Sequence, residues 1–367
     1  MIPINAPQIG EEEVGAVVNV LKSGILTHGL GAGPMVKKFE EEFARFVEAK
    51  HAVAVNSGTA ALHMAVVGAG VRQGDEVILP SFTFVATAET VVMAGAKPIF
   101  VDIDPETYNI SPEKIEKAVT RKTKAIIAVD LYGSPADLKP IREIADNHGL
   151  KVIEDAAQAH GAAYDSKPIG VYADIACWSF YASKNMTTGE GGMVTTNDDE
   201  IAETLKLMRS HGEKEKYKSI LLGHNYRMPE IEAAIGCVQL KKLPSFLDKR
   251  RENAERLTAI LREAENLQLP KEPKGCRNSW YLYTLRIKDV DRKRRDFIVE
   301  KLKDKGVGAE VYYPWPIHFM PYYRKFGKQR LPETEKASEQ VFSLPVHPGV
   351  TVKQISFIGI AVLHLLK

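Results

Sequence analysis

Short apolar runs alternate with longer amphipathic stretches through most of the chain. Apolar runs of this length, bounded by small or polar residues, are typical of buried strands in a parallel sheet. They predict strands at residues 51–55, 76–80, 97–102, 125–130, 151–155 and 193–196, and one more that begins near Cys177. Helices are expected at residues 11–22, 36–48, 60–68, 112–119, 138–148 and 201–209. This alternation predicts an α/β fold with a mostly parallel central sheet and helices on both faces.

The last third of the chain has a different order of elements. A long helix that contains residues 230–240 is expected. The passage to a smaller unit is expected to begin at Pro244–Phe246, and a helix rich in Arg and Glu follows to about Ala264. Strands are expected at residues 281–287 and 308–313, and helices at 292–305 and 352–366. We therefore expect two domains, a large one over residues 1–245 with the N-terminal segment and a smaller C-terminal α+β domain over residues 246–367.

Composition and charge narrow the class of protein. The apolar share of 44% is ordinary for a globular chain, and the net charge of +2 gives no reason to expect nucleic acid or a membrane surface as a partner. The three cysteines form no C-x-x-C pair, which is typical of reduced thiols in the cytosol and argues against disulfides or a thiolate metal site. There is no signal-peptide pattern and no apolar run long enough to span a bilayer. We expect a cytoplasmic protein without a metal.

The stretch from Lys151 to Gly192 carries the chemistry around which the chain is organised. Asp155 ends one predicted strand, and Lys184 closely follows another. Ligands of open α/β sheets bind at the carboxyl ends of strands, so an acid and an amine are placed to face one crevice. Lys184 could form a Schiff base with an aldehyde cofactor, and Asp155 could keep a pyridinium nitrogen protonated. The alternatives are a helix-capping acid and a solvated loop lysine.

Two further segments suit a phosphorylated, flat ligand. The run Asn56-Ser57-Gly58-Thr59 joins a strand to a helix, where free N–H groups and the helix dipole favour an anion. An ordinary Ser or Thr cap is the alternative. Phe84 follows another strand and could cover a flat ring, or pack in the core. The glycines at residues 29–33 follow a helix rather than a strand, so they do not predict a dinucleotide-binding turn.

From about Ala6 to its C-terminus, the chain resembles the sugar aminotransferases of the DegT/DnrJ/EryC1/StrS family, which are fold-type I enzymes that use pyridoxal 5′-phosphate (PLP). The motifs that carry the resemblance, in the order and spacing of the family, are Asn56-Ser57-Gly58-Thr59-Ala60-Ala61-Leu62, Pro80-Ser81-Phe82-Thr83-Phe84, Glu154-Asp155-Ala156-Ala157-Gln158-Ala159-His160-Gly161, Ser179-Phe180 through Lys184-Asn185, Gly189-Glu190-Gly191-Gly192 and Asn225-Tyr226-Arg227-Met228.

The resemblance implies roles for individual residues. Lys184 would bind PLP covalently and Asp155 would pair with its pyridine nitrogen, which makes these two the catalytic residues. The other implied cofactor contacts are Gln158 at the phenolic oxygen, Phe84 on the ring, Gly58, Thr59 and Ser179 at the phosphate, and Asn225 at the phosphate of the neighbouring subunit. Candidates for contacts with the sugar are Arg227, Tyr313 and His318. The family forms homodimers with shared active sites, so a homodimer is expected here.

The implied reaction is transfer of an amino group from L-glutamate to a nucleotide-linked keto-hexose, at carbon 4, in amino-sugar biosynthesis. The segment at residues 311–318 is aromatic and lacks the arginine that would bind a keto acid bidentately, although its rings could also be core. Two alternatives stay open. One is a PLP-dependent deoxysugar dehydratase, whose relatives carry histidine in place of the lysine, so Lys184 argues against it. The other is a PLP-binding regulatory protein without turnover.

Overall fold

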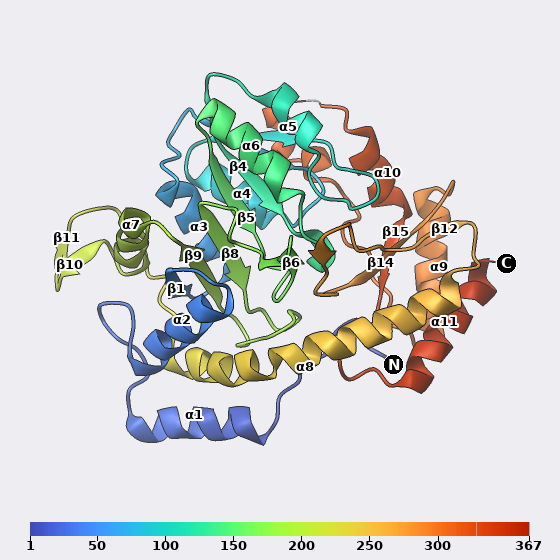
Figure 1. The fold of residues 1–367 in the computed structure, drawn as a ribbon, viewed down its shortest axis with the longest axis horizontal. Helices are drawn as coiled ribbons and strands as arrows, with labels where there is room; N and C mark the ends of the chain where they lie inside the picture. The colour runs from blue at the N-terminus through green and yellow to red at the C-terminus, as the bar shows by residue number, and fades with distance from the viewer. Residues whose placement is uncertain (328, 367) are drawn as a thin grey trace.

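A central sheet dominates the computed structural model, which describes residues 1–327 and 329–366 (Figure 1). Within these residues the sheet has seven strands in the order β1-β9-β8-β5-β4-β2-β3. The strands are β1 (His51–Val55), β2 (Glu76–Pro80), β3 (Lys97–Val101), β4 (Thr123–Val129), β5 (Lys151–Asp155), β8 (Ile175–Ser179) and β9 (Gly192–Thr196). Neighbouring strands pair in parallel, except that β9 runs antiparallel to β1 and β8. The predicted α/β class with a mostly parallel sheet is therefore confirmed.

Successive strand residues point to opposite sides of this sheet, and both sets are apolar. Helices cover both faces and bury these side chains. Ile126 packs on the face covered by α2 (Pro34–Phe46), α5 (Pro112–Ala118), α6 (Leu138–His148) and α8 (Glu230–Leu261). Ile127, the next residue of β4, packs on the face covered by α3 (Gly58–Gly68), α4 (Ala86–Met93) and α7 (Asp199–Arg209). Burial on both faces explains why the strands are continuous apolar runs in the sequence.

The C-terminal part has its own apolar core. In the described chain, β12 (Leu267–Gln268), β14 (Tyr283–Ile287) and β15 (Val341–Leu344) form a three-stranded antiparallel sheet. The helices of this part are α9 (Arg292–Asp304), α10 (Pro332–Gln340) and α11 (Val352–Leu366). The smaller α+β region is confirmed, whereas its boundary at residue 245 stays a prediction.

Smaller elements complete the described chain. They are the strands β6 (Ala163–Tyr164), β7 (Lys167–Pro168) and β13 (Cys276–Arg277), the hairpin of β10 (Glu213–Glu215) and β11 (Lys218–Ser219), and the 3-10 turns η1 (Leu131–Gly133), η2 (Ile317–Phe319) and η3 (Tyr323–Phe326). The strand predicted at residues 308–313 is wrong. In the described part of the chain this segment forms only an isolated bridge, from Glu310 to Ser343.

The two helices expected on either side of Pro244–Phe246 are one, because α8 runs from Glu230 to Leu261 with Pro244 inside it. A proline removes one helical N–H donor and crowds the carbonyl four residues earlier. Leu240 and Leu243 are buried beside it, and α8 packs against α2, α11 and the N-terminal helix α1 (Glu11–Ser23). These tertiary contacts outweigh the local cost of the proline.

Helix α1 confirms the prediction at residues 11–22, but its apolar face is open. Figure 1 shows α1 along the outside of α8. Val14, Val18 and Leu21 are 49%, 38% and 54% exposed in the single chain. None of the helices in the described residues is both long and apolar enough to cross a membrane. Val14, Val18 and Leu21 lie one helical turn or two apart and form an exposed apolar stripe on α1.

Candidate active site

Several predicted site residues meet where adjacent strands end. Asp155 is the last residue of β5 and Ser179 is the last residue of β8, its neighbour in the sheet. The loop at residues 180–191 joins β8 to β9 and carries Lys184. The end of β1 lies at the same edge, because β1 and β8 flank β9 and both run antiparallel to it. The topology thus brings the Asp155, Lys184 and Ser57–Thr59 segments to one side of the sheet.

Asp155 is buried and held by two hydrogen bonds. Its Oδ2 accepts from Thr87 Oγ1 at 2.9 Å, and its Oδ1 accepts from the backbone N–H of Ala157 at 3.3 Å. Burial raises the pKa of Asp155 above the ordinary carboxyl value, while these two bonds and the positive charge of Lys184 oppose the rise. A cationic ring nitrogen facing this carboxylate would further favour its ionised form.

Lys184 is half-buried beside an aromatic ring. Its Nζ lies 4.9 Å from the centroid of the Tyr281 ring. Its backbone N–H donates to the carbonyl oxygen of Tyr181 at 2.9 Å, which fixes a turn at this point of the loop. The face of an aromatic ring attracts a cation but offers no proton acceptor as strong as a carboxylate. The contact with Tyr281 therefore holds the amine in place without engaging it in an ion pair.

The predicted phosphate cradle is built from close backbone approach. Helix α3 begins at Gly58, and the capping residue Ser57 accepts a hydrogen bond from the N–H of Ala60 at 3.1 Å. A Cβ atom at Gly58 would lie only 2.7 Å from Cβ of Ser179. A Cβ at Gly192 would lie 2.3 Å from the carbonyl oxygen of Ser57. Only glycines allow α3 to present its N-terminal N–H groups beside Ser179.

We predict that Gly58→Ala weakens PLP binding by about tenfold or more, because the added methyl group moves the start of α3 away from Ser179. The measurement is the dissociation constant of PLP, obtained by titrating apo protein and following absorbance. Gly15→Ala on α1 is the matched control, since a Cβ there meets no atom within 4 Å. Wild-type affinity in Gly58→Ala would count against the cradle.

Gln158, Tyr313 and Phe84 form a connected group. Gln158 is buried, and its Nε2 donates to the Tyr313 hydroxyl at 3.0 Å while its Oε1 accepts from the N–H of Tyr132 at 2.8 Å. The rings of Tyr313 and Phe84 lie 6.2 Å apart, and Phe84 is 54% exposed. The group therefore offers an amide and an open aromatic face next to one another.

The remaining predicted residues lie in different surroundings. Asn225 is exposed, and its carbonyl oxygen accepts from Asn56 Nδ2 at 3.3 Å, so its backbone adjoins the cradle. Arg227 Nη1 donates to Ser210 Oγ at 3.0 Å. His318 is 4% exposed and its Nδ1 lies 2.7 Å from Ser81 Oγ. The structure thus places Asn225 at the surface and His318 in the interior.

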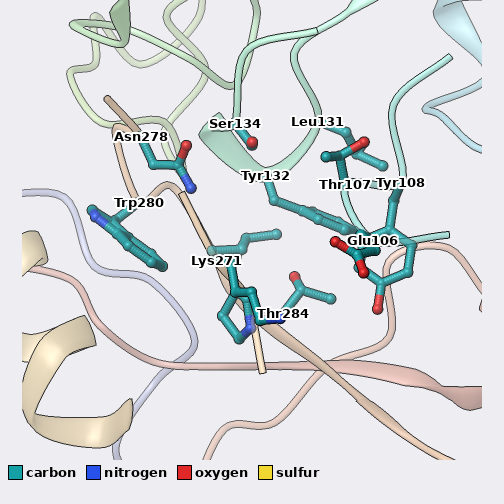
Figure 2. Close-up of a pocket in the computed structure, with 12 residues that line it drawn as sticks. Glu106, Thr107, Tyr108, Leu131, Tyr132, Ser134, Lys271, Asn278, Trp280 and Thr284 are labelled. Atoms are coloured by element: carbon teal, nitrogen blue, oxygen red, sulfur yellow. The ribbon is translucent and has the colours of Figure 1, made fainter. Parts of the chain in front are cut away.

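A small cavity that the sequence did not predict lies beside Tyr132 (Figure 2). Its volume is about 30 Å³, and its walls include Tyr108, Tyr132, Asn278 and Trp280. A cavity of this size holds one or two water molecules rather than a substrate. Tyr132 nevertheless connects it to the candidate site, because the backbone N–H of Tyr132 bonds Gln158.

The fold and the site define the class of protein. Four groups lie at or just after the strand ends. They are the buried carboxylate of Asp155, the amine of Lys184, the N-terminus of α3, where a Cβ on Gly58 would clash with Ser179, and the exposed ring of Phe84. These groups fit, in order, the pyridine nitrogen, the aldehyde, the phosphate and the ring of PLP. The class is an α/β enzyme that uses PLP.

Comparison with known proteins narrows the class. The family model of the DegT/DnrJ/EryC1/StrS aminotransferases matches residues 7–362. The pleiotropic regulatory protein of Geobacillus stearothermophilus is 44% identical over 331 residues, 89% of this chain and 88% of that protein. The GDP-perosamine synthase of Caulobacter vibrioides is 37% identical over 361 residues, 96% and 95% of the two chains. DesV of S. venezuelae, solved in complex with a ketimine intermediate, gives a TM-score of 0.93 at 36% identity and covers 100% of this chain and 99% of its own.

The chain belongs to the DegT/DnrJ/EryC1/StrS aminotransferase family. It is an enzyme of the PLP-dependent sugar aminotransferases, and the resemblance inferred from its motifs is confirmed. The assignment of individual roles to Lys184, Asp155 and the other predicted residues stays a prediction.

Proposed function

We propose that this enzyme transfers the amino group of L-glutamate to carbon 4 of a nucleotide-linked keto-hexose. The observation that carries the proposal is that Asp155 ends β5, Lys184 follows the adjacent strand β8, and an aromatic pair, Tyr313 and Phe84, is bonded through Tyr313 to Gln158, three residues after Asp155. Aromatic faces and single hydrogen-bonding groups suit a sugar, whereas a keto acid calls for a bidentate arginine. The likeness to a GDP-perosamine synthase supports a nucleotide-linked acceptor.

The residues divide the chemistry between them. When bound, PLP supplies an aldehyde that takes up the amino group and a cationic ring that accepts an electron pair. The Lys184 amine removes a proton from the glutamate carbon that bears the amino group. In the second half-reaction it delivers a proton to the sugar carbon that receives the amino group. Asp155 stays ionised against the ring nitrogen and keeps it protonated. The start of α3, at Gly58 and Thr59, binds the phosphate and fixes the distance to Lys184.

The acceptor is tested by comparing kcat/KM with glutamate as donor. The substrates are UDP-, GDP- and dTDP-linked 4-keto-6-deoxyhexoses on one side, and pyruvate and oxaloacetate on the other. We predict that at least one keto-sugar is preferred by about 100-fold or more. A site whose polar groups bind a sugar's hydroxyls leaves those polar groups unpaired when a keto acid is bound. NMR of the product locates the new amino group. Faster amination of the keto acids than of every keto-sugar refutes the sugar assignment, and an amino group on another carbon refutes carbon 4.

A regulatory role without turnover is the second candidate. One observation favours it, namely the likeness to the pleiotropic regulatory protein of G. stearothermophilus. A bound-cofactor spectrum is expected for both candidates, so it does not separate them. Conversion of glutamate to 2-oxoglutarate in the presence of a keto-sugar separates them, because a regulator without turnover gives none. The dehydratase alternative is disfavoured by Lys184, which stands where such relatives carry histidine.

A homodimer with shared active sites is also part of the proposal. Ile9, Ile25 and Leu26, which flank α1 in the sequence, are 52%, 45% and 46% exposed and add to the apolar surface of its exposed stripe. Contiguous exposed apolar residues on this scale are typical of protein–protein interfaces. A groove of about 380 Å³ also lies between α1, α2 and α8. Asn225 is exposed beside the cradle, and we propose that it contacts the phosphate bound by a second subunit.

Shared sites predict complementation between inactive chains. Lys184→Ala and Asn225→Ala homodimers should both be nearly inactive. After subunit exchange, a mixed dimer contains one site with both native residues, so about a quarter of wild-type activity is expected from an equal mixture. Activity is measured after exchange is confirmed with differently tagged chains. Confirmed mixed dimers without recovered activity would contradict sharing through Asn225.

A further inference from the structure

A chain of hydrogen bonds links Arg250, in the middle of α8, to the loop that carries Lys184. The guanidinium Nη1 donates to the carbonyl oxygens of residues 280–281 at 3.2 and 3.1 Å. Its Nη2 donates to Asn5 Oδ1 at 2.9 Å. Asn5 Nδ2 in turn donates to the carbonyl oxygen of Ser183, the residue before Lys184. Three distant parts of the chain therefore meet at this loop.

Tyr281, whose carbonyl oxygen Arg250 binds, also contacts the Lys184 loop directly. Its hydroxyl lies 2.9 Å from Ser183 Oγ, and its ring faces Lys184 Nζ at 4.9 Å. Asn185 Nδ2 donates to the carbonyl oxygen of Ser279 at 3.0 Å. The residues on both sides of Lys184 are thus tied to the segment 279–281, which Arg250 holds.

Arg250 occupies an unusual position for a guanidinium. It is 2% exposed, and burial lowers its pKa to about 10. Burying a charge costs free energy unless its donors are bonded, and here the bonds go to two carbonyls and Asn5. Asn5 uses both ends of its amide, accepting from Arg250 and donating to Ser183. Such a two-sided contact fixes a loop in position and bonds both terminal nitrogens of the guanidinium, while Nε has no partner among the described residues.

We infer that Arg250 and Asn5 are positioning residues that hold the Lys184 amine in place for its reaction with PLP. The inference rests on the proposed role of Lys184. In that reaction the amine condenses with the aldehyde and one water is released, so the rate depends on how closely the amine is held to the aldehyde carbon. Displacements of about 1 Å lower such rates up to 100-fold. Neither residue is expected to contact the phosphate or the ring.

The test separates the covalent reaction of Lys184 with the PLP aldehyde, called capture below, from non-covalent binding of the cofactor. Apo protein of Asn5→Ala and Arg250→Lys is mixed with PLP, and the rise of the visible absorption band is followed by stopped flow. The affinity for pyridoxine 5′-phosphate, which carries an alcohol in place of the aldehyde, is measured in parallel. We expect capture to slow by about tenfold or more in both variants, with the affinity for the alcohol changed less than about twofold.

Arg295→Lys is the matched control. Arg295 is also fully buried and also donates to two carbonyl oxygens, those of Ser338 and Val341, in the C-terminal region. It should change neither quantity. Wild-type capture rates in Asn5→Ala and Arg250→Lys, or an equal loss of affinity for the alcohol, would overturn the inference. Lys184→Ala should abolish capture, and if it captures PLP normally, the proposed role of Lys184 fails instead.

Discussion

Replacing Lys184 with alanine is expected to lower the rate of amino transfer by at least about 1,000-fold, because it removes the amine that moves the proton in both half-reactions. The structural reason for this expectation is the half-buried position of the side chain beside Tyr281, in the loop that follows β8. Steady-state kinetics with glutamate and the best keto-sugar measure the loss. In the wild-type protein, borohydride reduction and peptide mapping should locate PLP on Lys184.

Two controls make the Lys184 result specific. Lys206→Ala removes an exposed lysine of α7 that pairs with Glu203, and it should leave the rate unchanged. Added methylamine should restore part of the activity of Lys184→Ala, because a small amine can enter the space and accept the proton. A label on any other lysine, or a rate in Lys184→Ala within tenfold of wild type, contradicts the assignment.

Asp155→Asn is expected to lower the rates of both half-reactions by about 100-fold or more, since a neutral amide no longer favours the protonated ring nitrogen. The amide oxygen can still accept the hydrogen bond from Thr87, so the fold should persist. Single-turnover absorbance changes with glutamate, and then with the keto-sugar, measure each half-reaction separately. Circular dichroism and the stoichiometry of bound PLP check that the site is intact.

Thr87→Val is the companion to Asp155→Asn. It removes one of the bonds that oppose the rise in the pKa of Asp155, so that pKa should rise further. The acid limb of the pH–rate profile should therefore move to higher pH, while the rate well above that limb stays within about tenfold of wild type. Near wild-type rates in Asp155→Asn would show that the carboxylate does not support the ring cation.

The sequence predicts the sheet well because its strands are buried on both faces and therefore stand out as continuous apolar runs. Burial on all sides also explains why helix α4 was not predicted. Its residues Ala86, Thr87, Ala88, Thr90 and Val91 are all buried, so they show no polar face and no amphipathic period. The continuity of α8 through Pro244 escaped prediction for a different reason, since the contacts that stabilise the helix there come from other helices.

The candidate site was predictable where it depends on strand ends. Asp155 and Lys184 follow recognisable strands, and sheet topology alone places them at one edge. Thr87, Tyr281 and Asn5 were missed, because their contacts with this edge join segments far apart in the chain. No spacing in the sequence signals such contacts. The burial of His318 likewise follows from packing against Ser81 and not from any local pattern.

Helix α8 also bears on how the molecule unfolds. At 32 residues it is about 48 Å long, and its first half packs on the sheet while Leu257 and Leu261 belong to the C-terminal core. Loss of either core would strip one end of the same helix and expose its apolar side chains to water. The two regions are therefore thermodynamically coupled, and the chain is expected to melt as one cooperative unit although it contains two separate cores.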